Sequence, residues 1–143
     1  MLKFQRERLG DILPEIEKLL RNQCKEDGEI FSFDMPRLLD YDDCGYRRQY
    51  TARFNGRIVG HSAVYVSVSS RTNIKTAYDE SWYLLPDFRK GWNAVKLYKF
   101  VEKDLKNEGV KSIRLTLECG SRISSALDML NFKVLSVNYE KEL

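Results

Sequence analysis

The stretch of sequence that decides the fold reads Tyr83-Leu84-Leu85-Pro86-Asp87-Phe88-Arg89-Lys90-Gly91-Trp92-Asn93-Ala94-Val95. It predicts an apolar strand that ends at Pro86, a short basic loop and a helix, because proline cannot donate to a strand ladder. In the helix, apolar residues recur at spacings of four and three and form one stripe: Ala94, Tyr98, Val101 and Leu105. We expect the helix to end at Gly109.

The loop between this strand and this helix is a predicted anion site. Arg89 and Lys90 supply positive charge, and Gly91 lets the backbone approach a ligand with no Cβ in the way. A helix N-terminus adds unpaired N–H groups and the positive end of the helix dipole. The combination predicts a pyrophosphate site, and the alternative is an ordinary βα junction with a positively charged turn.

Two segments resemble motifs of one family, the GNAT acyltransferase superfamily. The usual acyl-CoA-binding loop of that family is Arg/Gln-x-x-Gly-x-Gly/Ala. Here Arg89-Lys90-Gly91-Trp92-Asn93-Ala94 keeps the Arg and the final small residue, with its glycine one place early. The loop is most similar to the compact Arg-Lys-Gly-x-x-Gly/Ala variant of phage-encoded members. Further along, Leu130-Asn131-Phe132-Lys133 resembles the family's Leu-Gly-Phe-Lys ending, with Asn for Gly.

The other segments predict the rest of the fold. Strands are expected over 2–9, 50–54, 57–69, 77–85, 112–119 and 133–140, and helices after Asp11, after Asp34 and over 120–130. Asn55-Gly56 between two alternating runs predicts a type I′ hairpin. The order indicates an α/β (α+β) layer fold with a right-handed crossover. The resemblance implies a GNAT-like mixed, mostly antiparallel sheet flanked by helices, with a βαβ acyl-CoA-binding core.

The composition is that of a soluble globular protein. The chain has 143 residues and a formal net charge of +3, which fits one domain over residues 1–143. There is no apolar run of membrane-span length, and the first residues lack the apolar core of a signal peptide. The three cysteines are odd in number and have no metal-ligand spacing. We therefore expect a cytoplasmic protein with no metal site and no membrane contact.

The resemblance implies a reaction and a set of binding residues. It implies an N-acetyltransferase that moves an acetyl group from acetyl-CoA to an amine, by direct attack in a ternary complex. Backbone groups of Leu84 and Leu85 would pair with pantetheine. The pyrophosphate would bind to the loop amides of Arg89, Lys90, Gly91, Trp92, Asn93, Ala94 and Val95. Cys119 and Ser121, after the strand over 112–119, are further candidates for the coenzyme cleft.

The amine must lose a proton before it attacks, since a lysine amine has a pKa of about 10.4, and a general base helps. Glu80 is the first candidate, because family bases often lie on this strand, and Asp79 is the second. By alternation, Glu80 shares a face with Trp82 and Leu84 unless a bulge changes the phase. Adjacent acids point to opposite faces, so at most one should line a site.

The leaving thiolate also needs a proton in many family members, and a tyrosine on the last short helix often supplies it. The usual position of that tyrosine is Leu127 here. Tyr139 and Ser121, with Ser124 and Ser125, are the remaining candidates. A thiol with a pKa of about 8.5 can also leave without an acid.

Two other functions compete with the enzyme. One is a catalytically inactive GNAT-fold protein that acts through a macromolecular partner. The other is a nucleic-acid-binding module that uses the lysines of the long helix, which the low net charge and the interspersed Glu102 and Asp104 disfavour. His61, alone in a strand, is expected to be structural. The acceptor amine, small molecule or protein, is left open, as is a possible homodimer.

Overall fold

The computed structural model describes residues 1–117 and 124–143. The strands are β1 (Lys3–Arg6), β2 (Arg47–Phe54), β3 (Arg57–Val68), β4 (Lys75–Leu84) and β5 (Ser112–Arg114). The helices are α1 (Leu13–Asp27), α2 (Met35–Asp43), α3 (Asn93–Asn107) and α4 (Ser124–Met129), with 3-10 turns η1 (Leu9–Asp11) and η2 (Pro86–Phe88).

In the described part of the chain, the strands form one sheet in the order β1-β2-β3-β4-β5. The pairs β1–β2, β2–β3 and β3–β4 are antiparallel, and β4–β5 is parallel. The crossover from β4 to β5 runs through α3, so the predicted βαβ unit and mixed sheet are confirmed. The parallel pairing is short, since it joins only Thr76–Tyr78 to Ser112–Arg114.

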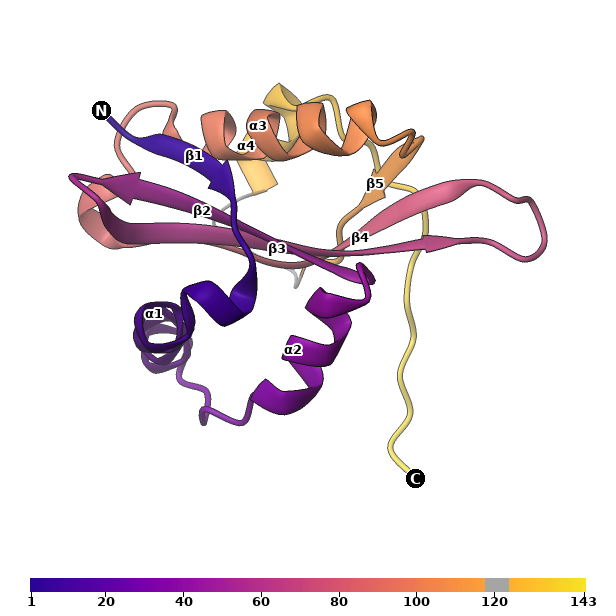
Figure 1. Ribbon diagram of the computed structural model, residues 1–143. Helices are drawn as coiled ribbons and strands as arrows, with labels where there is room; N and C mark the ends of the chain where they lie inside the picture. The colour runs from indigo at the N-terminus through magenta and orange to yellow at the C-terminus, as the bar shows by residue number, and fades with distance from the viewer. Residues whose placement is uncertain (118–123) are drawn as a thin grey trace.

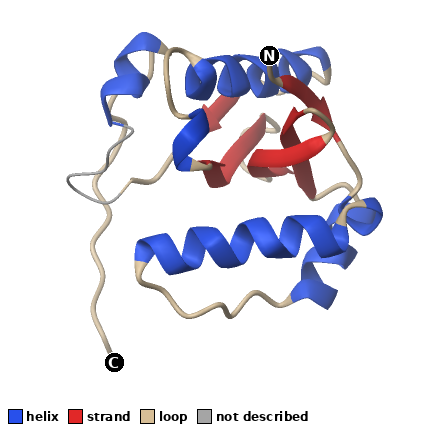
Figure 2. Cartoon of the chain, turned by 90° about the vertical axis from the view of Figure 1, so that its left-hand side faces the viewer, coloured by secondary structure: helices blue, strands red, loops and turns tan. Residues whose placement is uncertain are grey.

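Helices cover both sides of the sheet (Figures 1 and 2). On what we call the α3 face, Leu97, Val101 and Leu105 of α3 pack against Val64 and Ala77 of the sheet, among others. On the opposite side, the α1 face, residues of η1, α1 and α2 pack against the sheet: Leu9, Ile12, Ile16, Leu19 and Leu38 contact Ile58 and Tyr83. The molecule is therefore a three-layer sandwich with an apolar core on each side of the sheet.

A bulge in β4 determines which side chains reach which face. In the pairing with β3, Val64 lies opposite Asp79 and Ala63 lies opposite Ser81, which leaves Glu80 as the extra residue. Asp79 consequently points to the α3 face, toward Tyr98. Glu80 points to the α1 face, where it bonds Arg47. The expectation that Glu80 shares a face with Trp82 and Leu84 is wrong, because the bulge moves Asp79 into that phase.

Most local signals of the sequence have the expected structure. Asn55 and Gly56 both have positive φ, 50° and 80°, as a type I′ hairpin requires. The carboxylate of Asp34 accepts a hydrogen bond from the Arg37 amide and caps α2. Asp11 is not the N-cap of α1, however: it ends η1, and Ile12 takes the N-cap position.

The last part of the chain departs from the prediction. β5 has three residues, and the expected strand 133–140 is absent from the described residues, which form an exposed, extended segment there. Figure 1 shows this segment running away from the sheet to the C-terminus. None of the described helices is long and apolar enough to cross a membrane.

Candidate active site

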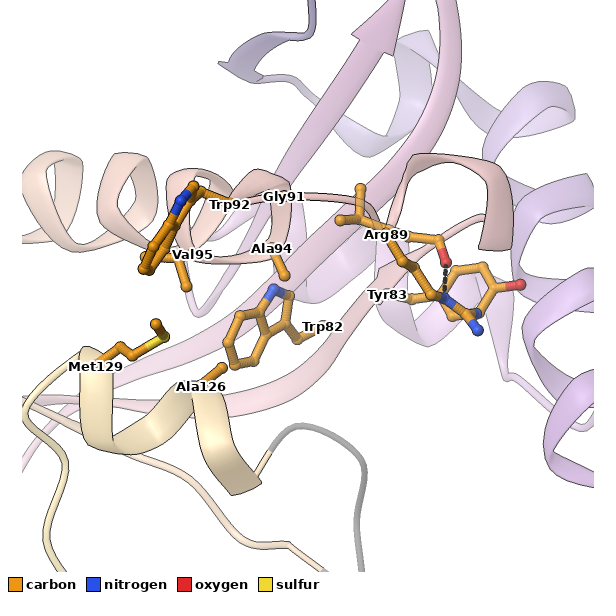
Figure 3. Close-up of a pocket in the computed structure, with 10 residues that line it drawn as sticks. Trp82, Tyr83, Arg89, Gly91, Trp92, Ala94, Val95, Ala126 and Met129 are labelled. Carbon is orange, nitrogen blue, oxygen red and sulfur yellow. Dashed lines mark hydrogen bonds between the residues drawn. The ribbon is translucent and has the colours of Figure 1, made fainter.

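A cleft of about 500 Å³ opens between the end of β4, the N-terminus of α3 and helix α4. We call it the β4–α3 cleft. Its walls are mostly apolar: Trp82, Leu84, Trp92, Val95, Ala126 and Met129. Figure 3 shows Trp82, Trp92 and Met129 gathered around the opening, with Arg89 and Tyr83 together at the other end. The residues of β4 that line it, Trp82 to Leu84, lie beyond the part of the strand that pairs with β5.

The N-terminus of α3 forms the polar end of this cleft. No side chain caps the helix, whose N-cap residue is Trp92, so its first-turn amides are available to an anion. Gly91 has a φ of 64°, a conformation that other residues adopt only with strain. The side chain of Asn93 donates to the Phe88 carbonyl and fixes the turn. These features fit a phosphate group.

Arg89 lines the cleft and also joins the loop to α1. Its guanidinium forms two short contacts with Glu26 of α1, at 2.6 and 2.7 Å, and its Nε donates to the Leu84 carbonyl at 2.8 Å. Tyr83 donates its hydroxyl to the same Glu26, and burial followed by this bond raises the pKa of Tyr83 to about 12. The charge of Arg89 is therefore matched by Glu26, while Lys90 is exposed on the loop.

The α3 face carries an unusual set of buried polar atoms. Oδ1 of Asp79, Nε1 of Trp82 and the hydroxyl of Tyr98 are buried, and none forms a hydrogen bond of normal geometry with a described residue. The Tyr98 hydroxyl lies close enough to Asp79 to lower its pKa somewhat. Burial, followed by repulsion from Glu80, outweighs this and raises the pKa of Asp79 to about 7. Buried polar atoms without partners often belong to a site for a ligand or water.

On the α1 face, polar side chains of β2, β3, β4 and α1 are joined by hydrogen bonds into what we call the Glu80 network. Glu80 accepts from Nε of Arg47 at 2.6 Å, and Arg47 in turn donates to Gln49 at 2.9 Å. Gln49 donates to Nδ1 of His61 at 3.2 Å. Nε2 of His61 lies 3.0 Å from Oε1 of Gln23, a residue of α1.

Within this network, His61 is neutral and structural. Its side chain is fully buried, and burial, together with the positive charge of Arg47, lowers the pKa of His61 to about 3. The amide of Gln49 can only donate to Nδ1, so the proton sits on Nε2 and points to Gln23. The sequence-based expectation that His61 is structural agrees with this arrangement.

Tyr65 connects the Glu80 network to the surface. Burial, followed by the charge of Glu80, raises the pKa of Tyr65 to about 12. Its ring packs against Tyr46 at 4.9 Å and Tyr41 at 6.0 Å between centroids. Glu80 keeps 16% of its side chain exposed, whereas its partner Arg47 is almost fully buried.

Comparison with known proteins identifies the family. The sequence matches the acetyltransferase (GNAT) family over residues 13–126. The chain belongs to this family. No curated protein sequence matches it significantly. Members of the GNAT family use acetyl-CoA as the acetyl donor.

Solved structures of other GNAT proteins have the same fold. An aminoglycoside acetyltransferase from an uncultured soil metagenomic sample, in complex with sisomicin, has a TM-score of 0.79 and 18% identity, over 99% of this chain and 96% of that one. A predicted acetyltransferase with acetyl-CoA from Clostridium acetobutylicum has a TM-score of 0.76 and 14% identity, with the same coverage. Ribosomal-protein-alanine N-acetyltransferase from Brucella melitensis has a TM-score of 0.78 and 14% identity, over 100% and 99%.

Several predicted GNAT site residues do come together. Leu84, Arg89, Gly91, Trp92, Ala94 and Val95 line the β4–α3 cleft. Leu85 does not offer its amide to a ligand, because that amide donates to the Val59 carbonyl at 2.8 Å. Its carbonyl accepts from Phe88. The part of β4 left for pairing with an extended ligand is therefore its edge between Asp79 and Leu84.

Other predicted residues lie elsewhere. Tyr139 is 93% exposed on the C-terminal segment, so the structure does not bring it to the cleft as a proton donor. Cys119 and Ser121 lie outside the described residues, as do the side chains of Ser124 and Ser125. The described residues contain no cluster of three or more metal-ligating side chains.

Sequence reasoning missed the partners of the site residues. Glu26, Arg47 and Tyr98 are each far in sequence from the residue they contact. Tyr98 belongs to the apolar stripe of α3, and its spacing there predicts packing against the sheet but not the contact of its hydroxyl with Asp79. Arg47 and Gln49 stand two residues apart at the start of β2 and so share one face of the strand; this spacing of two polar side chains was the signal for a buried polar network on β2.

Proposed function

We propose that this protein is an N-acetyltransferase that transfers the acetyl group of acetyl-CoA to an amine by direct attack. The observation that carries the proposal is the β4–α3 cleft itself. It runs from an open helix N-terminus along the end of β4, and β4 carries two carboxyl side chains, Asp79 and Glu80, just beyond its pairing with β5. A coenzyme with phosphates at one end and a thioester at the other needs both of these features.

The length of the β4 edge that does not pair with β5 supports this orientation. Between Asp79 and Leu84 the strand advances by five residues, or about 17 Å at the usual rise per residue. That is a suitable length for an extended pantetheine arm. The phosphates would lie against Gly91, Lys90 and the first turn of α3, and the thioester would lie beside the bulge.

Glu80 is our proposed general base. It lies on the α1 face, and Arg47 holds its carboxylate in one orientation. Tyr65 lies beside this carboxylate, and the amine would approach from that side. Glu80 can then take the proton that the amine must lose before or during attack.

The acceptor is proposed only as a class, an amine that carries a positive charge in solution. Structural relatives include one in complex with sisomicin and one named for ribosomal-protein alanine. The acidic residues of α2 offer little further guidance, since Asp42 accepts from the Leu9 amide and Asp43 pairs with Arg8. We would test sisomicin, an alanine-starting peptide and a lysine-containing peptide in parallel.

The first test is a thermal shift with acetyl-CoA, with ATP as the comparison. A ligand at a hundred times its dissociation constant stabilises by about 2.7 kcal/mol, which for a chain of this size raises the melting temperature by about 6–10 °C. Lys90→Glu should lose most of the shift, and Lys103→Glu, on the outer side of α3, should keep it. We would not use Arg89→Glu, because it breaks the ion pair with Glu26.

The outcomes separate the enzyme from a binding protein. A shift with acetyl-CoA, followed by release of free thiol with one of the amines, supports the transferase. A shift without transfer to any amine or peptide supports an inactive GNAT-fold protein that acts through a partner. No shift at saturating acetyl-CoA overturns the proposal.

A further inference from the structure

We propose that Asp79 is the proton donor to the coenzyme sulfur, so that two adjacent carboxyl groups on β4 serve as acid and base from opposite faces of the sheet. This inference rests on the proposed function. It gives Asp79 a role other than that of an alternative base. It also supplies the proton donor that the family's usual tyrosine would provide, since Leu127 on α4 stands at the position of that tyrosine.

The β4 bulge provides the geometry. Regular alternation would also place neighbours on opposite faces, but the bulge decides which one lies on which side. Asp79 pairs in register with Val64 and shares the α3 face with Trp82, whose side chain lines the β4–α3 cleft. Glu80 is turned to the α1 face and to Arg47. The acid is thus on the coenzyme side and the base on the acceptor side.

The two carboxyl groups differ in what surrounds them. Glu80 has a guanidinium at 2.6 Å. Asp79 has no cationic partner among the described residues, and its Oδ1 is buried without a hydrogen bond. An ion pair favours the ionised carboxylate, whereas burial without a cation favours the protonated acid. Environments that push two carboxyl groups apart in this way are typical of acid–base pairs.

The other charged groups near Asp79 do not reverse this difference. On β4 itself the neighbour is Glu80, a like charge. From α3, Tyr98 lies against Asp79, and Glu102 acts on Tyr98. On β5, the guanidinium of Arg114 lies over the ring of Tyr78 at 5.9 Å, and Tyr78 pairs with Tyr65 on the α1 face. Charged groups that would ionise Asp79 are therefore absent from the described residues around it.

The proton balance is complete without another reactant. The charged amine first loses one proton to solvent and becomes the neutral nucleophile, and Glu80 takes the second proton from its nitrogen as the carbon–nitrogen bond forms. Asp79 gives its proton to sulfur as the carbon–sulfur bond breaks and the electron pair passes to sulfur. Free coenzyme A thiol leaves, Asp79 is ionised and Glu80 is protonated, and exchange of one proton with solvent at each group restores the starting state.

The acidity of Asp79 suits this role. Burial raises the pKa of Asp79 to about 7, so a large fraction of the protein holds the proton at neutral pH. A thiol has a pKa of about 8.5, so transfer from Asp79 to the thiolate is favourable. Tyr98 is a poor donor by comparison, because burial and then the charge of Asp79 raise its pKa far above the usual value.

The direct test is a ¹³C NMR titration of the aspartate carboxyl groups in the full-length protein without ligand. The Asp79→Asn variant assigns the Asp79 signal by its disappearance. We expect that signal to titrate near pH 7, well above the value of about 3.9 for an aspartate in an unfolded chain. Titration of Asp79 below pH 5 would overturn the inference, and this result does not depend on activity or on the acceptor.

The kinetic test uses the amine with the fastest turnover in the panel above. We expect the wild-type kcat to fall above pH 7 as Asp79 loses its proton. Asp79→Asn should lower kcat by about 100-fold, remove this alkaline decline and leave KM for acetyl-CoA nearly unchanged. Asp11→Asn, the same chemical change at an exposed site, should behave as wild type.

These readouts keep the inference separate from the proposed function. An alkaline decline that persists in Asp79→Asn overturns the role of Asp79 while acetyl transfer stands. If the kcat of wild type instead declines below pH 7 and Asp79→Asn removes that decline, Asp79 acts as a base, and its role as proton donor is overturned. If no amine is acetylated, the proposed function fails, and the NMR titration still decides whether Asp79 holds a proton at neutral pH.

Discussion

The two faces of the sheet treat neighbouring carboxyl groups in opposite ways. On the α1 face, Glu80 belongs to a chain of hydrogen bonds that runs through Arg47 and Gln49 to His61. On the α3 face, Asp79 is surrounded by apolar and aromatic groups, and the polar atoms near it have no normal partners. Both carboxyl groups lie on β4, one residue apart.

The difference indicates that the ionic and hydrogen-bonding partners of a buried carboxyl group affect its protonation more than its degree of burial does. Removing water from an ionised group is costly unless a counter-charge and hydrogen bonds replace the water. Arg47 provides that replacement for Glu80, whereas Asp79 has none and keeps its proton more readily. A single bulge can therefore produce two chemically distinct groups from two acids in sequence.

The largest effect should come from breaking the pair on the α1 face. Glu80→Gln leaves the Arg47 guanidinium, which is 1% exposed, without a counter-charge. Removing one partner of a buried pair costs about 3–5 kcal/mol, and we expect the lower end because Glu80 keeps some solvent contact. Urea unfolding at pH 7 measures the loss. Asp43→Asn, which breaks the exposed pair with Arg8, should cost below about 0.5 kcal/mol; equal losses in both variants would contradict the comparison.

The next effect concerns His61 and acid. The pKa of His61 is lowered to about 3 in the folded protein and is about 6.5 when unfolded, so the unfolded chain binds an extra proton between these values. Stability is therefore lost as pH falls through 6.5, by about 3 kcal/mol between pH 7 and pH 4. His61→Gln should remove this part of the acid sensitivity, whatever it costs at neutral pH. Unfolding curves of wild type and His61→Gln at pH 4, 5, 6 and 7 give the slope of the free energy of unfolding against pH. Equal slopes for the two proteins would contradict the prediction.

Asp79 should produce the opposite pH dependence. Its pKa is about 7 in the folded protein and about 3.9 unfolded, so here the folded state holds the extra proton. Its contribution to stability is lost as pH rises from 5 to 7, by about 2.5 kcal/mol. Asp79→Asn should be more stable than wild type at pH 8 and close to it at pH 5. The same measurements on Asp11→Asn supply the baseline. A wild-type protein more stable than Asp79→Asn at pH 8 would contradict this interpretation.

The sequence could predict the layers of this fold because they depend on local patterns. Alternation and Asn55-Gly56 define the β2–β3 hairpin, and the apolar stripe defines α3 between its basic loop and Gly109. The site at the N-terminus of α3 follows from the same local signals. Such a site requires only a strand, a glycine with positive φ and an uncapped helix that follow one another along the chain.

The faces of the strands could not be predicted, because a bulge is a property of a pair of strands. Alternation alone places Ile58 with Val64 and Val66, yet Ile58 packs on the α1 face and the two valines on the α3 face. The register between β2 and β3 shifts at Ala52 and Arg53. A similar shift in β4 reversed the expected placement of Asp79 and Glu80.

Ion pairs between distant segments were equally invisible to sequence patterns. Arg89 stands in a loop that resembles a phosphate-binding motif, and its charge alone suggested contact with the coenzyme. Its actual partner, Glu26, lies 63 residues away at the end of α1. The structure thus separates the two charges of the loop: Arg89 joins the loop to α1, and Lys90 is exposed to solvent.

The smallest effect we expect comes from separating these two charges. Glu26→Gln removes the ion pair but leaves the bond from Arg89 to the Leu84 carbonyl, so the loss of stability should be about 1 kcal/mol given the partial exposure of both side chains. Arg89 then carries an unmatched charge at the edge of the cleft, and acetyl-CoA should bind a few-fold more tightly at low salt. Calorimetric titration with acetyl-CoA measures this change. Glu17→Gln, which breaks an exposed pair with Arg21 on the same helix, should leave affinity unchanged. Weaker binding in Glu26→Gln would mean that Glu26 holds the loop in its binding conformation, and the α1 and α3 sides of the molecule would then be coupled through Arg89.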